Sequence, residues 1–157
     1  GNKVQRIIHQ LKYNNKSESG FRMGELYGHE IQHVPQWQDL DIIIPVPLHA
    51  KKKRQRGYNQ SECIASGLAS VLNIPVSTTH LLKKVQTSSQ TQKTRFERYE
   101  SQKEAFLIQN STEIERKHIL LIDDVITTGA TLEACATALL EVKDVRISIA
   151  GIAFAKS

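Results

Sequence analysis

An apolar run that ends in two adjacent acids is the feature that most constrains how this chain can fold. The sequence ILLIDDVITTGAT, residues 119–131, places branched apolar residues before Asp123 and Asp124 and a threonine-rich turn with Gly129 after them. A short apolar run bounded by turn residues is typical of a strand that is buried on both faces of a parallel sheet. Because ligands bind beyond the carboxyl ends of such strands, we expect both acids at a ligand-binding edge.

The turn after the acids has the composition of a phosphate-binding loop. Gly129 permits backbone angles or a close approach that a side chain would prevent, and a helix is expected to follow. Backbone amides at a helix N-terminus bind phosphate. The two carboxylates suit ribose hydroxyls or a magnesium ion carried by the ligand. A sugar phosphate would satisfy both halves, although acids at a strand end are also ordinary features of doubly wound domains.

The rest of the chain alternates between predicted strands and predicted helices. The segment DIIIPVPL, residues 41–48, predicts another buried strand, which we expect to lie centrally in the sheet. The alternation predicts an α/β domain with a mostly parallel sheet, and 157 residues suffice for one such domain. The other expected strands are 74–76, 81–85, 105–108, 118–123 and 145–155, and the expected helices are 4–11, 21–34, 58–72 and 131–142.

The charge of the chain favours polyanionic partners such as nucleic acid, nucleotides or pyrophosphate. The net charge is +5 and the sequence pI is about 9.3, with basic residues gathered at 51–56 and again between 83 and 103. No segment approaches the roughly 20 apolar residues of a transmembrane helix, so we expect no membrane insertion and a cytoplasmic location. Cys63 and Cys135 lie far apart, which argues against a disulfide framework or a cysteine-rich zinc site.

Four segments together carry a family resemblance. Residues 119–131 resemble the phosphoribosyl-pyrophosphate signature of the type I phosphoribosyltransferases. The segments HQLKYNN, IIIPVPLHAKKKRQRGYNQSECIASGLA and SSQTQKTRFERYESQKEAF resemble the ComF/GntX family of competence-associated phosphoribosyltransferase-like proteins, and the matches cover most of the chain. The four-cysteine zinc module that many members carry before this domain is not among these residues. Two residues differ from the family patterns. Ser101 stands where the ComF/GntX family usually has an asparagine, and Thr127 stands where some purine-salvage phosphoribosyltransferases have an acidic residue.

The resemblance implies an architecture. It implies the α/β type I phosphoribosyltransferase fold, in which a mostly parallel central sheet is flanked by helices and carries a small hood. It further implies a single domain over residues 1–157, with N-terminal helices and hood in 1–36. The long polar stretch at 86–102 would then be the flexible lid loop of that fold.

The resemblance also implies a role for each part of the site. Asp123 and Asp124 would be the catalytic acids that bind the ribose hydroxyls, and Mg²⁺ would arrive on phosphoribosyl pyrophosphate without direct protein ligands. The ribose 5-phosphate loop would comprise Val125, Ile126, Thr127, Thr128, Gly129, Ala130 and Thr131. The pyrophosphate loop would comprise Val46, Pro47, Leu48 and His49, with Arg54 and Arg56 as helpers. The lid would contribute Gln90, Thr91, Arg95 and Arg98.

Two functions from different classes fit these features. One is an enzyme that transfers phosphoribosyl to an unidentified nitrogen acceptor. The other is a non-catalytic competence or DNA-uptake module that binds nucleotide, single-stranded DNA or competence-machinery proteins; a homodimer is a further candidate assembly. Stacking on DNA would fall to Tyr58, Phe96 and Tyr99 in an aromatic-poor chain. The structural alternatives are a solvated charged loop at 51–56 and a helix start capped by Asn59.

A competing motif occurs near the N-terminus. The sequence HEIQH, residues 29–33, matches the H-E-x-x-H pattern of zinc peptidases, which requires both histidines on one helix face. Pro35 follows closely, and the later glycine and third histidine of the extended metzincin pattern are missing. We therefore expect a surface helix with two histidines in preference to a zinc site.

Overall fold

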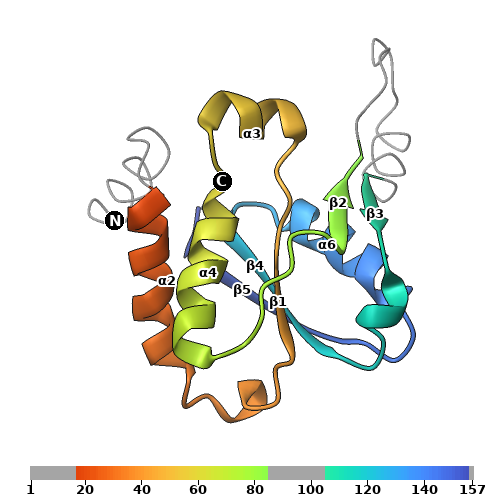
Figure 1. Cartoon of the computed structure of the whole chain (residues 1–157), viewed down its shortest axis with the longest axis horizontal. Helices are drawn as coiled ribbons and strands as arrows, with labels where there is room; N and C mark the ends of the chain where they lie inside the picture. The colour runs from red at the N-terminus through yellow and green to blue at the C-terminus, as the bar shows by residue number, and fades with distance from the viewer. Residues whose placement is uncertain (1–16, 85–104, 156–157) are drawn as a thin grey trace.

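The computed structural model describes residues 17–84 and 105–155 (Figure 1). The expected helix at 4–11 and the expected lid at 86–102 therefore both lie outside the described residues. The elements in chain order are α2 (Ser17–Ile31), η1 (Pro35–Trp37), β1 (Ile42–Pro45), α3 (Ala50–Arg56), α4 (Gln60–Leu72), β2 (Leu81–Lys83), β3 (Phe106–Ile108), η2 (Ser111–Glu113), β4 (His118–Ile126), α6 (Ala130–Leu140) and β5 (Arg146–Phe154).

The main sheet is parallel and has the strand order β1-β4-β5. The middle strand is β4, so the expectation that β1 lies centrally is wrong. All four residues of β1 are nevertheless buried, because Ile42 and Ile44 pack into a hydrophobic cluster on one face and Ile43 into a cluster on the other. The outer edge of β1 carries a single parallel bridge between Ile43 and Val76. The strand expected at 74–76 is reduced to this bridge, since Pro75 has no N–H with which to extend a ladder.

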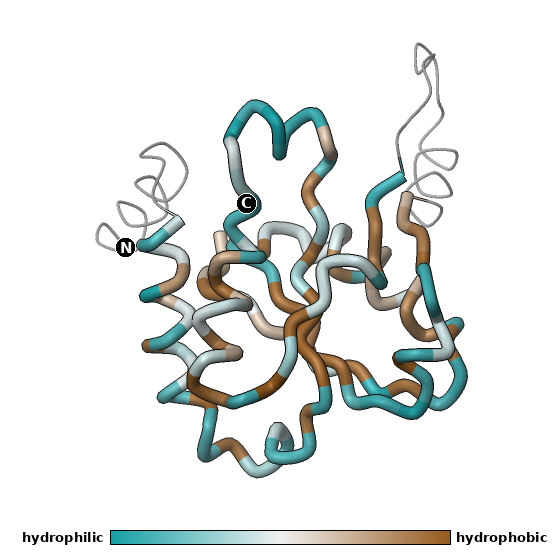
Figure 2. The backbone as a smooth tube through the Cα atoms, viewed as in Figure 1, coloured by the Kyte–Doolittle hydropathy of each residue, from teal (hydrophilic) through white to brown (hydrophobic). Residues whose placement is uncertain are grey.

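Each face of the sheet is covered by its own hydrophobic cluster. Leu120 and Ile122 of β4 pack with Ile64 and Leu68 of α4 on one face. Ile119 and the other alternate residues of β4 pack with α6 and the β2–β3 pair on the other face. Figure 2 shows the hydrophobic residues concentrated along these strands. Residues 119–122 have no exposed surface, which agrees with a strand buried on both faces.

A second, smaller sheet lies beside the first. In the residues that the structure describes, it consists of β2 and β3, which pair antiparallel with Leu82 opposite Leu107. The strand expected at 105–108 is therefore present, and it runs against β2 instead of joining the parallel sheet. The chain between these two strands, 85–104, lies outside the described residues.

The first described helix has different ends from those expected. It runs from Ser17 to Ile31, and Gln38 Nε2 donates to the Gln32 carbonyl at 2.6 Å in the turn that follows. His33 therefore lies beyond the helix, and the H-E-x-x-H residues do not share a helix face. In the described part of the chain, no group of three or more His, Cys, Asp or Glu side chains could hold a metal ion. The helices there are also too short or too polar to cross a membrane.

The amino edge of the main sheet is joined by hydrogen bonds of His118, which is 5% exposed. Its Nδ1 lies 2.8 Å from Asp39 Oδ1, and its Nε2 lies 2.8 Å from Ser148 Oγ. Asp39 also pairs with Arg146, and the Asp41 carboxylate accepts the His118 backbone N–H at 2.7 Å. These bonds connect the segment before β1 with the first residues of β4 and β5. They fix the three strands relative to one another at the edge opposite the two acids.

Helices α2 and α4 cross at a point where both lack side chains. A Cβ atom on Gly24 would lie 2.1 Å from the Ile64 carbonyl oxygen, and one on Gly67 would lie 2.0 Å from the Phe21 carbonyl oxygen. These distances are far inside van der Waals contact, so the two helices can pack this closely only with glycine at both positions.

The change Gly67→Ala tests this packing. Alanine is the better helix former by about 1 kcal/mol, but the new Cβ would meet backbone that no rotamer change can move. We expect a loss of about 2 kcal/mol or more in the free energy of unfolding, measured by chemical denaturation. The neighbouring exposed change Ser66→Ala is the control and should stay within about 0.5 kcal/mol. Equal stability of the two variants would contradict the close crossing.

Candidate functional site

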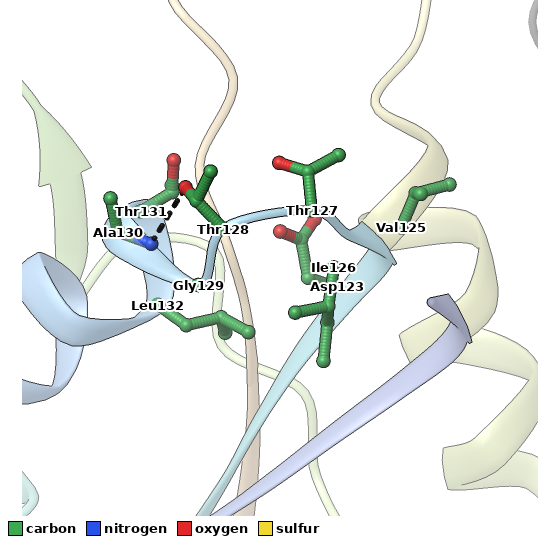
Figure 3. A pocket seen from close by; sticks show the side chains of 9 residues that line it. All are labelled: Asp123, Val125, Ile126, Thr127, Thr128, Gly129, Ala130, Thr131 and Leu132. Atoms are coloured by element: carbon green, nitrogen blue, oxygen red, sulfur yellow. Dashed lines mark hydrogen bonds between the residues drawn. The ribbon is translucent and has the colours of Figure 1, made fainter. Parts of the chain in front are cut away.

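The carboxyl end of β4 and the turn into α6 form a hollow of about 230 Å³ (Figure 3). The residues that line it are Asp123, Val125, Ile126, Thr127, Thr128, Gly129, Ala130, Thr131 and Leu132. The structure thus brings together the whole predicted 5-phosphate loop and one of the two predicted acids. Strand β4 continues to Ile126, three residues beyond the expected end, so both acids lie within the strand.

Gly129 determines how the chain leaves β4 and enters α6. It is the N-cap of α6 and has a φ of 78°, a left-handed conformation that favours glycine. A Cβ there would meet nothing within 4 Å, so the backbone angle and not close approach requires glycine. Thr128 Oγ1 accepts the Ala130 N–H at 3.4 Å, and the first turn of α6 faces the hollow. Such a helix start attracts an anion through its free amides and its dipole.

The two acids differ in their surroundings. Asp123 Oδ1 accepts hydrogen bonds from Ser61 Oγ at 3.1 Å and from the Asp124 N–H at 2.9 Å. Burial, followed by the neighbouring charge of Asp124, raises the pKa of Asp123 from 3.8 to about 6. Ionisation of both neighbouring carboxyl groups at once is therefore unfavourable. The pair favours a ligand that brings hydroxyl donors and positive charge.

The first turn of α4 adds residues that the sequence analysis did not assign to the site. Asn59 caps the helix by accepting the Ser61 N–H at 3.1 Å, which confirms the structural alternative given above for this residue. Ser61 reaches Asp123 across the fold, and no pattern near Ser61 in the sequence indicated that contact. The only local signal is a serine in the first turn of the predicted helix 58–72.

A second pocket of about 600 Å³ lies between the segment after β1 and the small sheet. Leu48 and His49 of the predicted pyrophosphate loop line it together with Ala105, and so do three lysines that had no assigned role: Lys52, Lys83 and Lys84. Val46 and Pro47 are not among the lining residues. The pocket has the positive charge that a diphosphate requires.

The basic cluster at 51–56 lies in helix α3 and all of its residues are exposed, so it is a solvated charged segment, as the structural alternative expected, but it is helical and not a loop. His49 Nδ1 accepts the Lys51 N–H at 3.2 Å at its start, and Gly57 ends it with a φ of 80°. Arg56 donates to Gln60 Oε1 at 3.4 Å, and Arg54 is exposed. Neither arginine lines the basic pocket.

The predicted lid residues lie outside the residues that the structure describes. They are Gln90, Thr91, Arg95 and Arg98. Burial raises the pKa of Cys135 to about 12, and burial also raises the pKa of Cys63. Both side chains therefore remain neutral thiols and do not act as thiolate nucleophiles.

Comparison with known proteins gives a consistent result. The sequence model of the phosphoribosyl transferase domain matches residues 59–157. The DNA utilization protein YhgH of Escherichia coli O157:H7 is 30% identical over 137 residues, which cover 85% of this chain and 60% of that protein. Competence protein F of Haemophilus influenzae is 34% identical over 152 residues, which cover 94% and 66%. The chain thus spans about 60% of the length of the first curated relatives that it matches.

Solved structures show the same fold. A purine phosphoribosyltransferase from Pyrococcus horikoshii superposes with a TM-score of 0.55 at 19% identity, over 85% of this chain and 71% of that one. A hypothetical protein from Neisseria gonorrhoeae with bound ppGpp superposes with a TM-score of 0.56 at 15% identity, over 87% of this chain and 68% of that one. These similarities confirm the type I phosphoribosyltransferase fold, with a parallel sheet flanked by helices and a small antiparallel hood sheet.

The raised pKa of Asp123 predicts how stability depends on pH. Because its folded-state pKa of about 6 exceeds the ordinary value of 3.8, the group stabilises the fold fully below 3.8 and loses that contribution as pH rises through 6. Asp123→Asn cannot ionise, so we expect it to exceed the wild type by about 1–3 kcal/mol in free energy of unfolding at pH 7.5. Near pH 4 the difference should vanish.

Chemical denaturation at the two pH values measures this effect. Asp144→Asn is the matched control, since Asp144 is exposed and its left-handed backbone, with a φ of 54°, also suits asparagine. A pH-independent effect of Asp123→Asn would show that Asp123 titrates normally.

Proposed function

The chain belongs to the phosphoribosyl transferase domain family, and from this membership we propose that it binds magnesium phosphoribosyl pyrophosphate and transfers phosphoribosyl to a nitrogen acceptor. The observation that carries the proposal is the pair Asp123–Asp124 placed directly beside a threonine loop at a helix N-terminus. Its cytoplasmic location, expected from the sequence, is part of the same proposal.

The hollow beside α6 fits the ribose 5-phosphate part of the donor. The amides at the start of α6 and the hydroxyls of Thr127, Thr128 and Thr131 supply donors for a phosphate. The carboxylates of Asp123 and Asp124 accept hydrogen bonds from ribose hydroxyls. This arrangement holds the sugar ring between an electropositive and an electronegative group, which fixes its orientation.

The basic pocket fits the pyrophosphate part. His49, Lys52, Lys83 and Lys84 surround a space large enough for a diphosphate. Burial and the neighbouring charge of Asp124 raise the pKa of Asp123, so the acid pair favours positive charge close by. When bound, Mg²⁺ neutralises the charge that develops on the leaving pyrophosphate.

The proposed reaction is a displacement at the anomeric carbon. A nitrogen lone pair of the acceptor forms the new C–N bond as the C–O bond to pyrophosphate breaks, and the electron pair of that bond leaves with pyrophosphate. The acceptor nitrogen then releases its proton to solvent. The lysines of the basic pocket stabilise the departing charge. The chain at 86–102 would act as the lid that excludes competing water.

Calorimetric titration with magnesium phosphoribosyl pyrophosphate tests the proposal. The intact protein should bind it saturably, and the double variant Asp123→Asn, Asp124→Asn should bind at least ~10-fold more weakly, because it loses two charged acceptors. Asp144→Asn should bind like the wild type. Absence of binding by the intact protein would refute the proposed function.

A second candidate function is binding of single-stranded DNA, and the geometry of α3 favours it. This helix projects from the domain, and its residues after Ala50 are hydrophilic (Figures 1 and 2). Lys53 pairs with Glu62 at 2.8 Å, whereas Lys51 and Arg54 have no acid within salt-bridge distance in the described part of the chain. These exposed cations are available to phosphates of a nucleic acid backbone. Relatives named for DNA utilization and competence agree with this candidate.

Charge reversal on α3 tests DNA binding. Lys51→Glu, Arg54→Glu should weaken binding of a short oligothymidylate and reduce the log–log salt slope by roughly 1.4, which is about 0.7 for each lost phosphate contact. Lys143→Glu, on an exposed residue after α6, controls for net charge. No binding at low salt, or an unchanged slope, would argue against this function.

A further inference from the structure

We propose that Asn59 and Ser61 are positioning residues of the phosphoribosyl site, which hold its two pockets in a fixed relation through one turn of α4. Ser61 positions Asp123 in the hollow beside α6, and Asn59 positions the start of the segment that lines the basic pocket. This inference rests on the proposed function for its purpose, but its structural content can be measured in the free protein.

Asn59 makes more contacts than a helix cap requires. Its Oδ1 accepts the Ser61 N–H at 3.1 Å, which serine or aspartate would also do at this position. Its Nδ2 donates to the Val46 carbonyl at 3.0 Å, and the side chain is only 4% exposed. Asparagine alone among the good caps offers a side-chain amide donor together with the acceptor. The second bond therefore indicates a role beyond capping.

Val46 is held from both sides by this contact. Its N–H donates to the Ile122 carbonyl at 2.9 Å, which continues the ladder between β1 and β4 by one residue. Its carbonyl is taken by Asn59. Leu48 and His49, which line the basic pocket, follow two and three residues later. Their starting point is consequently fixed relative to β4 and α4 together.

Ser61 fixes the carboxylate at the other end of the turn. It is 3% exposed, and its hydroxyl donates to Asp123 Oδ1 at 3.1 Å. The Asp124 N–H binds the same oxygen. Two donors on one oxygen restrict rotation of the carboxylate, and Ser61 also lowers the pKa of Asp123 against the effect of burial.

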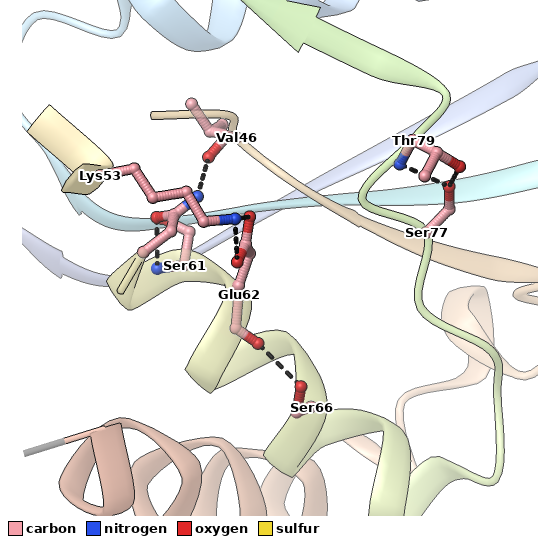
Figure 4. Close-up of polar contacts among 8 residues, drawn as sticks. Val46, Lys53, Ser61, Glu62, Ser66, Ser77 and Thr79 are labelled. Atoms are coloured by element: carbon pink, nitrogen blue, oxygen red, sulfur yellow. Dashed lines mark hydrogen bonds and ion pairs between the residues drawn. The ribbon is translucent and has the colours of Figure 1, made fainter. Parts of the chain in front are cut away.

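The same turn also holds α3. Lys53 Nζ lies 2.8 Å and 2.9 Å from the two carboxylate oxygens of Glu62 (Figure 4). Arg56 donates to Gln60 Oε1 at 3.4 Å. The first turn of α4 therefore contacts the end of β1, the end of β4 and the helix that carries Lys52. Displacement of this turn would move both pockets at once.

Three variants separate these roles. Asn59→Ser keeps the cap but removes the donor to Val46, Ser61→Ala removes the donor to Asp123, and Ser61→Thr retains a hydroxyl. Ser66→Ala is the matched control, because its hydroxyl bonds to the Glu62 carbonyl further along α4, away from Asp123. All are first compared by thermal unfolding, so that effects on folding are separated from effects on the site.

The free protein gives the first readouts. ¹³C NMR titration of the Asp123 carboxyl should show a pKa above the wild-type value of about 6 in Ser61→Ala, restored in Ser61→Thr and unchanged in Ser66→Ala. Hydrogen exchange of the Val46 amide should be faster in Asn59→Ser, while the Ile43 amide, bonded to Pro75 on the other side of β1, should not change. Wild-type values for both properties in the variants would overturn the proposal.

Ligand binding gives the second readout. Asn59→Ser and Ser61→Ala should each weaken the binding of magnesium phosphoribosyl pyrophosphate by ~3- to 10-fold. In Ser61→Ala the pH of half-maximal affinity should rise, which a general loss of stability would not produce. If the intact protein binds no phosphoribosyl pyrophosphate while the free-protein readouts shift as expected, the proposed function fails and the positioning roles stand. If the intact protein binds and the variants match it in every readout, the positioning roles fail alone.

Discussion

A carboxylate that directly follows the fully buried residues of β4 is the constraint on which the rest of this structure depends. Residues 119–122 of β4 have no exposed surface, and Asp123 follows them with a pKa raised to about 6. Such a group is stable in place only if donors gather around it or a ligand compensates its charge. The Ser61 hydroxyl and the Asp124 amide supply part of that compensation. The unfavourable remainder is what a bound sugar and its cation can relieve.

The position of Ser61 depends in turn on packing far from the site. Helix α4 reaches Asp123 with its first turn because its middle packs tightly against α2 and the sheet. Gly24 and Gly67 allow that crossing, since a side chain at either position would meet backbone of the other helix. A mutation at the crossing would therefore change the site without touching it. Local stability and ligand geometry are coupled here through one rigid helix.

The sequence predicted the parts of the site that are continuous along the chain. Strand β4 and its turn follow from an apolar run and a glycine with φ of 78°, both of which are local properties. The prediction that β1 lies centrally was wrong, because an apolar run indicates burial on both faces but not the number of neighbouring strands. Helix α3 has no apolar face to reveal it, and it forms between the His49 cap and Gly57. The convergence of Lys52, Lys83 and Lys84 depends on tertiary packing, which no local pattern contains.

The distribution of charge bears on whether the two candidate functions compete. The acids favour a ligand whose middle is a hydroxylated ring and whose ends are anionic, and the α6 N-terminus and the basic pocket accept those ends. A bare polynucleotide would be repelled at the acids. Lys51 and Arg54, however, are exposed and lie outside the pocket lining, whereas Lys52 on the same helix contributes to it. Because one short helix carries residues of both surfaces, the two proposed ligands, a nucleic acid strand and a sugar diphosphate, would both lie next to α3.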